Sequence, residues 1–363
     1  MDALTPPTMK VPPPSGGEQT LVNPPSLGMP TQHISGNARN TTTRNPAAGT
    51  ASNLDGITLS VTVQDLNTER LLQSASRIEA HGRQCPTLKG IPLLAKLGQG
   101  GMGAVYYGVH PRLRSEVAVK VLPFHLAEQD PQMIRRFYRE AQIAAQVRSP
   151  YLVNVTDVDE ECGLFFLVME YVNGNTAGSV LKSTLKNPKP GLPELDVLEI
   201  CIAATEGLNA AHTNGVVHRD IKPDNIMIPF QSRSNQTYDL SRSKLMDLGL
   251  ARSEEGGGGQ SLTGVQTAMG TPGYMAPEQA LDAKTADKRS DVFSMGATLY
   301  ALLVGTHPFP RDATMKVLMA TMHEPHEPVS VKRTDVSDAL SEVINKCLEK
   351  KQENRYADAQ QLS

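Results

Sequence analysis

Hydrophobic and polar positions follow a different pattern in the first part of the chain than in the rest. Residues 1–53 are rich in Pro, Thr, Asn, Ser and Gly and carry almost no periodic apolar signal that could offset the entropy of ordering. A partial helical stripe follows within residues 63–80, at Leu66, Leu71, Leu72 and Ile78. This stripe is as typical of a solvated helix or a chance pattern as of a docking helix. We therefore predict a disordered leader over residues 1–87 that contains at most a short helix.

From Leu88 onward the pattern predicts a β-rich lobe followed by a helical lobe. Short segments rich in β-branched residues and broken by glycines indicate an antiparallel meander with strands over 90–97, 104–110 and 116–122. Helical spacing predicts one helix over 133–147, and an apolar run indicates a further buried strand over 164–172. The helical lobe has predicted helices over 195–212, 290–305, 313–322 and 337–350. The fold class is therefore α+β.

Composition and charge exclude several classes of function. The net charge of -3, from 35 Lys and Arg against 38 Asp and Glu, gives no chain-wide basic field for nucleic acid or anionic lipid. The four cysteines form no C-x-x-C pair, which argues against a disulfide framework and a zinc knuckle and favours the reducing cytoplasm. The longest apolar stretch, 292–304, is too short to span a membrane and predicts a buried core helix. A membrane anchor beyond Ser363 stays open.

A glycine string and a lysine form the first candidate site for phosphate. Residues 98–105 read G-x-G-x-x-G-x-V between two predicted strands, and glycines there let backbone N–H groups approach phosphates closely. Alone, the string is equally typical of a plain turn, while a strand rather than a helix after it disfavours a dinucleotide fold. Lys120 ends the V-A-V-K strand and can neutralise phosphate oxygens if a carboxylate holds it, for which Glu140 is the candidate.

The order of five motifs resembles that of a eukaryotic-like serine/threonine protein kinase of the bacterial type. After the glycine string and V-A-V-K come H-R-D-I-K-P-D-N at 218–225, Asp-Leu-Gly at 247–249 and Ala-Pro-Glu at 276–278. The resemblance covers about Leu94 to Arg355 and implies the two-lobed kinase fold, with ATP bound in a cleft between the lobes. The implied boundaries are a kinase domain over 88–363, with an N-lobe over 88–170, a hinge over 170–173 and a C-lobe over 174–363.

The resemblance also implies a role for each residue of the catalytic segment. Asp220 accepts the proton of the substrate hydroxyl and orients it, while Lys222 contacts the γ-phosphate. Asn225 and Asp247 supply oxygen ligands to Mg²⁺, a hard cation that bridges the phosphates. Lys120 is the fifth member of this set and takes the α/β-phosphates.

The implied ATP site combines the glycine string, the lysine with its carboxylate and the hinge. Met169 is the implied gatekeeper, and Val105 and Ala118 form the ceiling over adenine, although both also suit an ordinary strand core. The full implied set is Leu97, Gly98, Gln99, Gly100, Gly101, Met102, Gly103, Ala104, Val105, Ala118, Lys120, Glu140, Glu170 and Val172.

Substrate class and regulation follow from the same resemblance. Lys222 and Thr271 are what serine/threonine-specific members carry, so protein Ser and Thr hydroxyls are the expected substrates. Arg219 is expected to pair with a phosphate in the loop 253–271, which contains Gly256–Gly259; Thr263 and Thr267 are the candidate sites, and both are also ordinary exposed hydroxyls. A regulatory partner for the leader is a further expectation.

Two departures and two structural roles complete the expectations. Leu248 stands where the family more often has Phe, and residues 229–243 are longer and more polar than usual, which predicts a solvated hairpin. Glu278 is expected to pair with Arg355, and Asp291 to cap backbone N–H groups of the catalytic loop.

Two other functions remain as alternatives to an active protein kinase. A catalytically silent scaffold with the same fold usually lacks the lysine, the catalytic Asp or the metal Asp, and all three are present here. A small-molecule phosphotransferase of related fold normally lacks the Ala-Pro-Glu segment.

Overall fold

The computed structural model describes residues 53–54, 57–100, 103–122, 131–232, 234, 236–248 and 271–363. A short hairpin of β1 (Asn53–Leu54) and β2 (Ile57–Thr58) precedes the main body of the structure. The predictions for residues 1–52 and for the loop from 249 to 270 lie outside the described residues.

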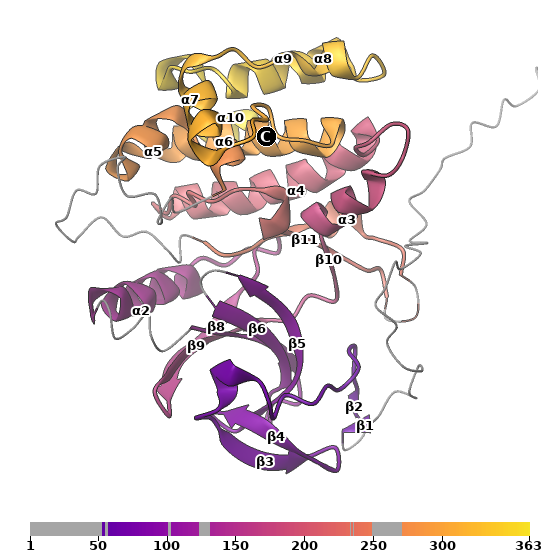
Figure 1. Ribbon diagram of the computed structural model, residues 1–363, viewed down its shortest axis with the longest axis vertical. Coiled ribbons are helices and arrows are strands. Elements are labelled where there is room, and N and C mark those ends of the chain that lie inside the picture. The colour runs from indigo at the N-terminus through magenta and orange to yellow at the C-terminus, as the bar shows by residue number, and fades with distance from the viewer. Residues whose placement is uncertain are drawn as a thin grey trace, which may run out of the picture. The chain divides into compact units, whose positions relative to one another are not determined.

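A seven-stranded antiparallel sheet forms the N-terminal lobe and curls around its own core (Figure 1). Its strands run in the order β3-β4-β5-β6-β7-β9-β8, and α2 (Pro131–Gln146) is the helix of this lobe. Alternate positions of the central strands are β-branched and buried, such as Val117, Val119 and Val121. The strands are β3 (Ser76–Ala80), β4 (Arg83–Leu88), β5 (Ile91–Gly100), β6 (Gly103–Val109), β7 (Glu116–Val121), β8 (Val155–Glu161) and β9 (Leu164–Glu170). The predicted meander, its helix and the buried strand are confirmed.

The predicted start of the folded domain at Leu88 is wrong. Strands β3 and β4 pair with each other and then with β5, so the chain is folded before this boundary. Within residues 63–80 only the 3-10 turn η1 (Arg70–Leu72) forms before β3 begins, so of the alternatives left open for the apolar stripe the structure agrees with a chance pattern. The apolar residues of the supposed stripe instead enter the core of the sheet, where Leu66 and Leu72 are buried. Tertiary burial therefore decides the structure here rather than helical periodicity.

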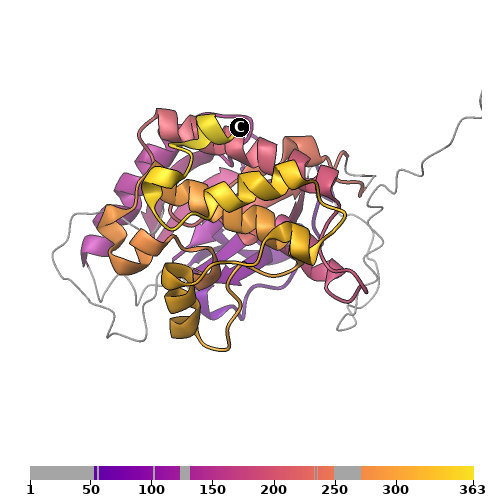
Figure 2. The same cartoon turned by 90° about the horizontal axis from the view of Figure 1, so that it is seen from above.

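The C-terminal lobe stacks helices over a small three-stranded sheet (Figure 1). Helix α6 (Lys288–Val304) is buried from Ser290 to Leu303, which confirms the predicted core helix. It contacts α4 (Glu194–Thr213) and α9 (Asp338–Cys347), and Figure 2 shows α9 and α6 in front of the strands. The other helices are α3 (Ala177–Thr184), α5 (Pro277–Leu281), α7 (Thr314–His323), α8 (Val329–Lys332) and α10 (Ala359–Leu362).

The small sheet carries the hairpin that its polar sequence predicts. Its strands are β10 (Gly174–Thr176), β11 (Ile226–Pro229) and β12 (Lys244–Leu245), with β11 and β12 antiparallel. Within the hairpin, the rings of Phe230 and Tyr238 stack with centroids 5.1 Å apart. In the described ranges, no helix is both long enough and apolar enough to cross a membrane.

Candidate active site

Polar side chains of the segment 218–225 gather around the carboxylate of Asp220. Lys222 Nζ lies 2.8 Å from Asp220 Oδ2. Asn225 Nδ2 donates to the Asp220 backbone carbonyl at 2.7 Å and to Oδ2 at 3.1 Å. The Asp220 side chain is 36% exposed. A carboxylate fixed by two donors and still open to solvent can receive an incoming hydroxyl.

Asp291 caps the backbone N–H groups of this segment, as the sequence predicts. Its two carboxylate oxygens accept the N–H groups of His218 and Arg219, each at 2.7 Å. The Asp291 side chain is fully buried, and its Oδ2 also lies 2.9 Å from His212 Nε2. Arg219 has a φ of 67°, in the left-handed region that non-glycine residues rarely adopt. The charged cap and a hydrogen bond from Gln279 Nε2 to the Arg219 carbonyl at 2.8 Å hold this strained turn in place.

The buried ring of His218 links Asp220 to the segment that carries Asp247. Its Nδ1 accepts the backbone N–H of Asp220 at 3.3 Å, and its Nε2 lies 2.9 Å from the carbonyl of Met246. These two contacts fit the tautomer with its proton on Nε2. The Met246 N–H donates in turn to the Asn225 carbonyl at 3.0 Å. The two implied metal ligands, Asn225 and Asp247, are therefore on neighbouring segments with a shared hydrogen-bond framework.

Lys120 from the N-terminal lobe reaches Asp247 from the C-terminal lobe. The distance from Lys120 Nζ to Asp247 Oδ1 is 2.8 Å, and both side chains are largely shielded from solvent. Burial would raise the pKa of Asp247, but the charge and hydrogen bond of Lys120 outweigh it and hold the pKa below its ordinary value. Asp247 has a φ of 61°, so its backbone is strained at this position. A charged aspartate at this position could serve as a ligand to a cation.

The expected carboxylate partner of Lys120 differs from the one that the structure describes. Glu140 belongs to α2, but its side chain lies outside the described residues, and its pairing with Lys120 stays a prediction. The contact between Lys120 and Asp247 was missed by sequence reasoning, because no local pattern relates two residues from different lobes. Leu248, which follows Asp247, is buried.

The glycine string forms the turn end of the β5–β6 hairpin. Gly98, Gln99 and Gly100 pair with Val105, Ala104 and Gly103, and Val105 faces Lys120 across β6 and β7. Gly103 has a φ of 127°, and a Cβ there would lie 2.1 Å from the carbonyl oxygen of Val121, so only glycine fits. Leu97 is exposed beside the string, whereas Gly101 and Met102 are outside the described residues.

The implied adenine residues lie on β6 and β7, near the end of β9 and just after it. Ala118 pairs with Met169, and both are buried, while Val105 and Val172 are half-buried. Glu170 has a structural role that sequence reasoning missed. Its carboxylate accepts from Lys244 Nζ at 2.6 Å and Asn154 Nδ2 at 3.2 Å, and its N–H donates to the Asn154 carbonyl at 2.9 Å.

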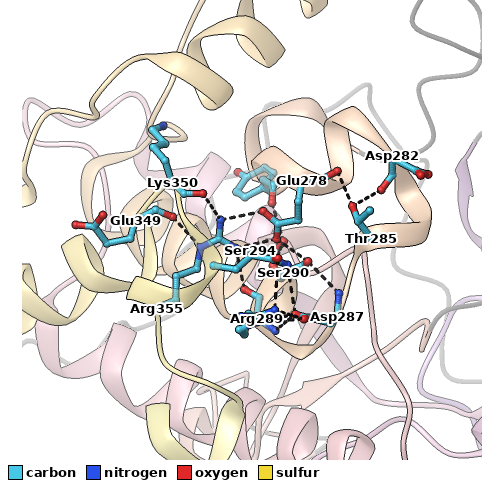
Figure 3. A network of polar contacts seen from close by, with 12 residues as sticks. Glu278, Asp282, Thr285, Asp287, Arg289, Ser290, Ser294, Glu349, Lys350 and Arg355 are labelled. Carbon is cyan, nitrogen blue, oxygen red and sulfur yellow. Dashed lines mark hydrogen bonds and ion pairs between the residues drawn. The ribbon is translucent and has the colours of Figure 1, made fainter.

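The pair of Glu278 and Arg355, predicted from the sequence, forms with both oxygens and both nitrogens engaged (Figure 3). The distances are 2.8 and 2.9 Å, and the Arg355 side chain is fully buried. Ser290 Oγ also donates to Glu278 at 2.6 Å. Burial would raise the pKa of Glu278, but Arg355 and Ser290 hold it below its usual range. The pair connects α5 to the C-terminal segment. Its role is structural and differs from that of Asp220.

The protein kinase domain family matches residues 92–363 of this sequence. The chain belongs to the protein kinase family. It is 39% identical over 270 residues to the serine/threonine-protein kinase PknB of Mycolicibacterium smegmatis, covering 73% of this chain and 40% of that protein. It is also 37% identical over 266 residues to the serine/threonine-protein kinase Pkn1 of Myxococcus xanthus, over 73% and 36% of the two proteins. The chain thus spans about 40% of the length of the first of these relatives.

Solved structures show the same fold. The crystal structure of the PknI kinase domain of Mycobacterium tuberculosis has a TM-score of 0.58 at 26% identity, over 76% of this chain and 94% of that chain. A crystal structure of Rad53 has a TM-score of 0.59 at 22% identity, over 75% and 63% of the two chains, which bears on the fold alone. The predicted resemblance to bacterial serine/threonine kinases and the two-lobed α+β fold are confirmed.

Proposed function

We propose that this protein kinase domain transfers the γ-phosphoryl group of ATP to serine and threonine hydroxyls of proteins. The observation that carries the proposal is the ion pair between Lys120 of the N-terminal lobe and Asp247 of the C-terminal lobe. Lys222, which pairs with Asp220, lies close enough for its charge to act on Asp247 as well. Phosphoryl transfer needs little covalent chemistry and depends on positioning and charge neutralisation, which such an arrangement supplies. The names of the bacterial relatives support the same reaction.

Each residue has a role that its contacts can support. Asp220 orients the substrate hydroxyl and receives its proton, while Lys222 screens the carboxylate and faces the phosphate that is transferred. Lys120 neutralises the phosphates that lie under the glycine string. The backbone of the hinge around Val172 binds adenine.

Two side chains fit a magnesium ion. The two described hydrogen bonds of the Asn225 side chain are both donated by Nδ2, so Oδ1 is the atom that it offers to a metal. Asp247 offers a carboxylate whose pKa is lowered by Lys120. Both are hard oxygen ligands of the kind that Mg²⁺ prefers, and the bound ion would neutralise charge on the phosphate oxygens.

The proposed preference for Ser and Thr hydroxyls and the proposed regulation by phosphorylation are both argued from the sequence. Lys222 and the exposed Thr271 favour Ser and Thr substrates, and we propose that the domain phosphorylates its own loop at Thr263 or Thr267. A phosphate adds about -1.5 to -2 charges, which Arg219 can compensate beside the active site. Mass spectrometry after incubation with magnesium and ATP tests this step. An unmodified loop in a fully active enzyme would rule it out.

Transfer of label from radioactive ATP to a generic basic protein tests the proposed function directly. The chain should label Ser and Thr, and Asp220→Asn should lower the rate by about a hundredfold or more. Asp312→Asn is the matched control, because this aspartate is 75% exposed and its described ion pair is with Lys316 in α7. Nucleotide binding without any transfer would favour the silent scaffold, and labelled small molecules without labelled protein would favour the other phosphotransferase class.

A further inference from the structure

Residues 59–88 lie before the segment that matches the kinase family, yet they are built into the N-terminal lobe. Leu66, Leu72 and Ala75 are buried in one core cluster with kinase strands β5, β6, β7 and β9. Leu72 is fully buried, which marks it as part of the core rather than a surface attachment. The segment therefore shares its hydrophobic core with the strands that carry the ATP-site residues.

Contacts from the start of β3 and from the turn just past the end of this segment reach β8, the far edge strand of the curled sheet, and the turn that follows it. Lys89, in the turn between β4 and β5, forms ion pairs of 2.9 Å with Asp157 and 2.7 Å with Asp159 on β8. These aspartates belong to the strand at the opposite edge of the sheet. At the start of β3, Ser76 Oγ lies 3.7 Å from Cys162 Sγ in the turn after β8.

A chain of polar contacts runs from residues 59–88 to the glycine string. Gln64 donates its N–H to the Leu94 carbonyl at 2.7 Å, and its Oε1 accepts the N–H of Lys96 at 3.1 Å. The Lys96 ammonium then lies 2.9 Å from Glu69 Oε2 and 2.8 Å from Gln99 Oε1. Lys96 and Glu69 are 24% and 22% exposed, so solvent screens their attraction only in part. Gln99 is one of the residues of the glycine string.

A second set of contacts runs from the segment to the hinge. Leu59 is buried in a cluster with Tyr107, and Val61, Val63 and Tyr171 pack against that cluster. The rings of Tyr107 and Tyr171 meet edge to face, with centroids 4.9 Å apart. Tyr171 lies between the hinge residues Glu170 and Val172. The segment therefore contacts the elements at both ends of the expected nucleotide site.

We propose that residues 59–88 position the nucleotide site, and that Glu69 is a positioning residue that holds Lys96 and, through it, Gln99. This inference rests on the proposed ATP-dependent function. Glu69 fixes the ammonium, and the ammonium fixes the side chain of Gln99 in the glycine string. Ordering of the string before nucleotide binds lowers the conformational entropy that binding must overcome. Glu69 therefore acts on affinity for ATP rather than on the transfer step at Asp220.

The test compares Glu69→Gln with Glu79→Gln in the full chain. Glu79 is exposed on β3 of the same segment, so its variant has the same change of charge without a contact to the glycine string. We expect Glu69→Gln to raise KM for ATP, and Kd for a non-hydrolysable ATP analogue, by about three- to tenfold with kcat within about twofold. Glu79→Gln should leave all three constants unchanged.

A double-mutant cycle with Lys96→Met separates positioning from general stability. If the pair acts together, the double variant should raise Kd for the analogue no more than either single variant. Unchanged KM and Kd in Glu69→Gln, a lower Tm with unchanged Kd, or equal changes in Glu79→Gln would each overturn the proposal. Failure of the unaltered chain to transfer phosphate would refute the proposed function instead, while the comparison of analogue affinities would still decide the role of Glu69.

Discussion

Replacement of Glu278 by alanine should destabilise the C-terminal lobe without removing a group that acts on phosphate. Glu278 is 13% exposed and meets the fully buried guanidinium of Arg355 with two hydrogen bonds. Removing the carboxylate leaves a buried positive charge without its counterion. Measured losses for breaking a buried ion pair in this way are about 3–5 kcal/mol of the free energy of unfolding.

The surroundings of Arg355 place the expected loss in the lower part of that range. Its guanidinium also donates to the carbonyls of Glu349 at 2.7 Å, Lys350 at 3.0 Å and Arg289 at 3.1 Å. It further lies 4.9 Å from the centre of the Phe293 ring. These contacts remain in the variant and retain part of the stabilisation of the charge. For a folded domain that spans residues 59–363, about 3 kcal/mol corresponds to a fall in Tm of roughly 5 °C.

Thermal unfolding of Glu278→Ala beside Glu342→Ala measures this effect. Glu342 is an exposed residue of α9 and serves as the matched surface control. Because the pKa of Glu278 is lowered on folding, its charged form contributes stability at neutral pH that is lost as the pH falls below about 4.5. Glu278→Gln should therefore lose less stability than the unaltered chain over that acid range. Equal Tm values for Glu278→Ala and its control would refute the reasoning.

Three further predictions concern the active site and the leader. Lys120→Met should lower phosphotransfer by about a hundredfold or more with little change in Tm, and full activity would contradict the assigned role of the lysine. Asn225→Ala and Asp247→Asn should each raise the magnesium concentration required for half-maximal turnover, whereas equal rates in EDTA and magnesium would exclude a metal role. Deletion of residues 1–53, which ends before the buried Leu59, should leave turnover on a peptide within about threefold, and a collapse in rate or Tm would show that they pack on the domain.

Local patterns were enough to predict most of the kinase fold. The apolar run over 292–304 predicted the buried helix α6, and alternation predicted the strands around Lys120. The cap at Asp291 and the pair of Glu278 with Arg355 followed from the family resemblance, because both belong to motifs of fixed order. These features have short or ordered sequence signals.

The strands β3 and β4, which precede Leu88, could not be predicted because their sequence lacks the usual strand signals. Pro86, which faces Arg77 across β3 and β4, has no N–H to donate to the ladder, so the strand signal is weak at that position. The spacing of Leu66 and Leu72 resembled a helix, although both enter the core of the sheet. The bridge from Glu69 through Lys96 had no local signature either, since the two residues meet only after the sheet has curled.

The contacts between the expected hinge and Asp247, the proposed metal ligand, link the N-terminal lobe to the C-terminal lobe. Lys244 on β12 binds the hinge carboxylate of Glu170, and Leu245 exchanges backbone hydrogen bonds with Tyr151 and Val153, which lie just before β8. Asp247 follows two residues later, where its left-handed backbone turns it toward Lys120. One short strand therefore fixes the position of the aspartate relative to both the hinge and the lysine. A change at Lys244 should consequently disturb magnesium and nucleotide binding together, although Lys244 belongs to none of the motifs that identify the family.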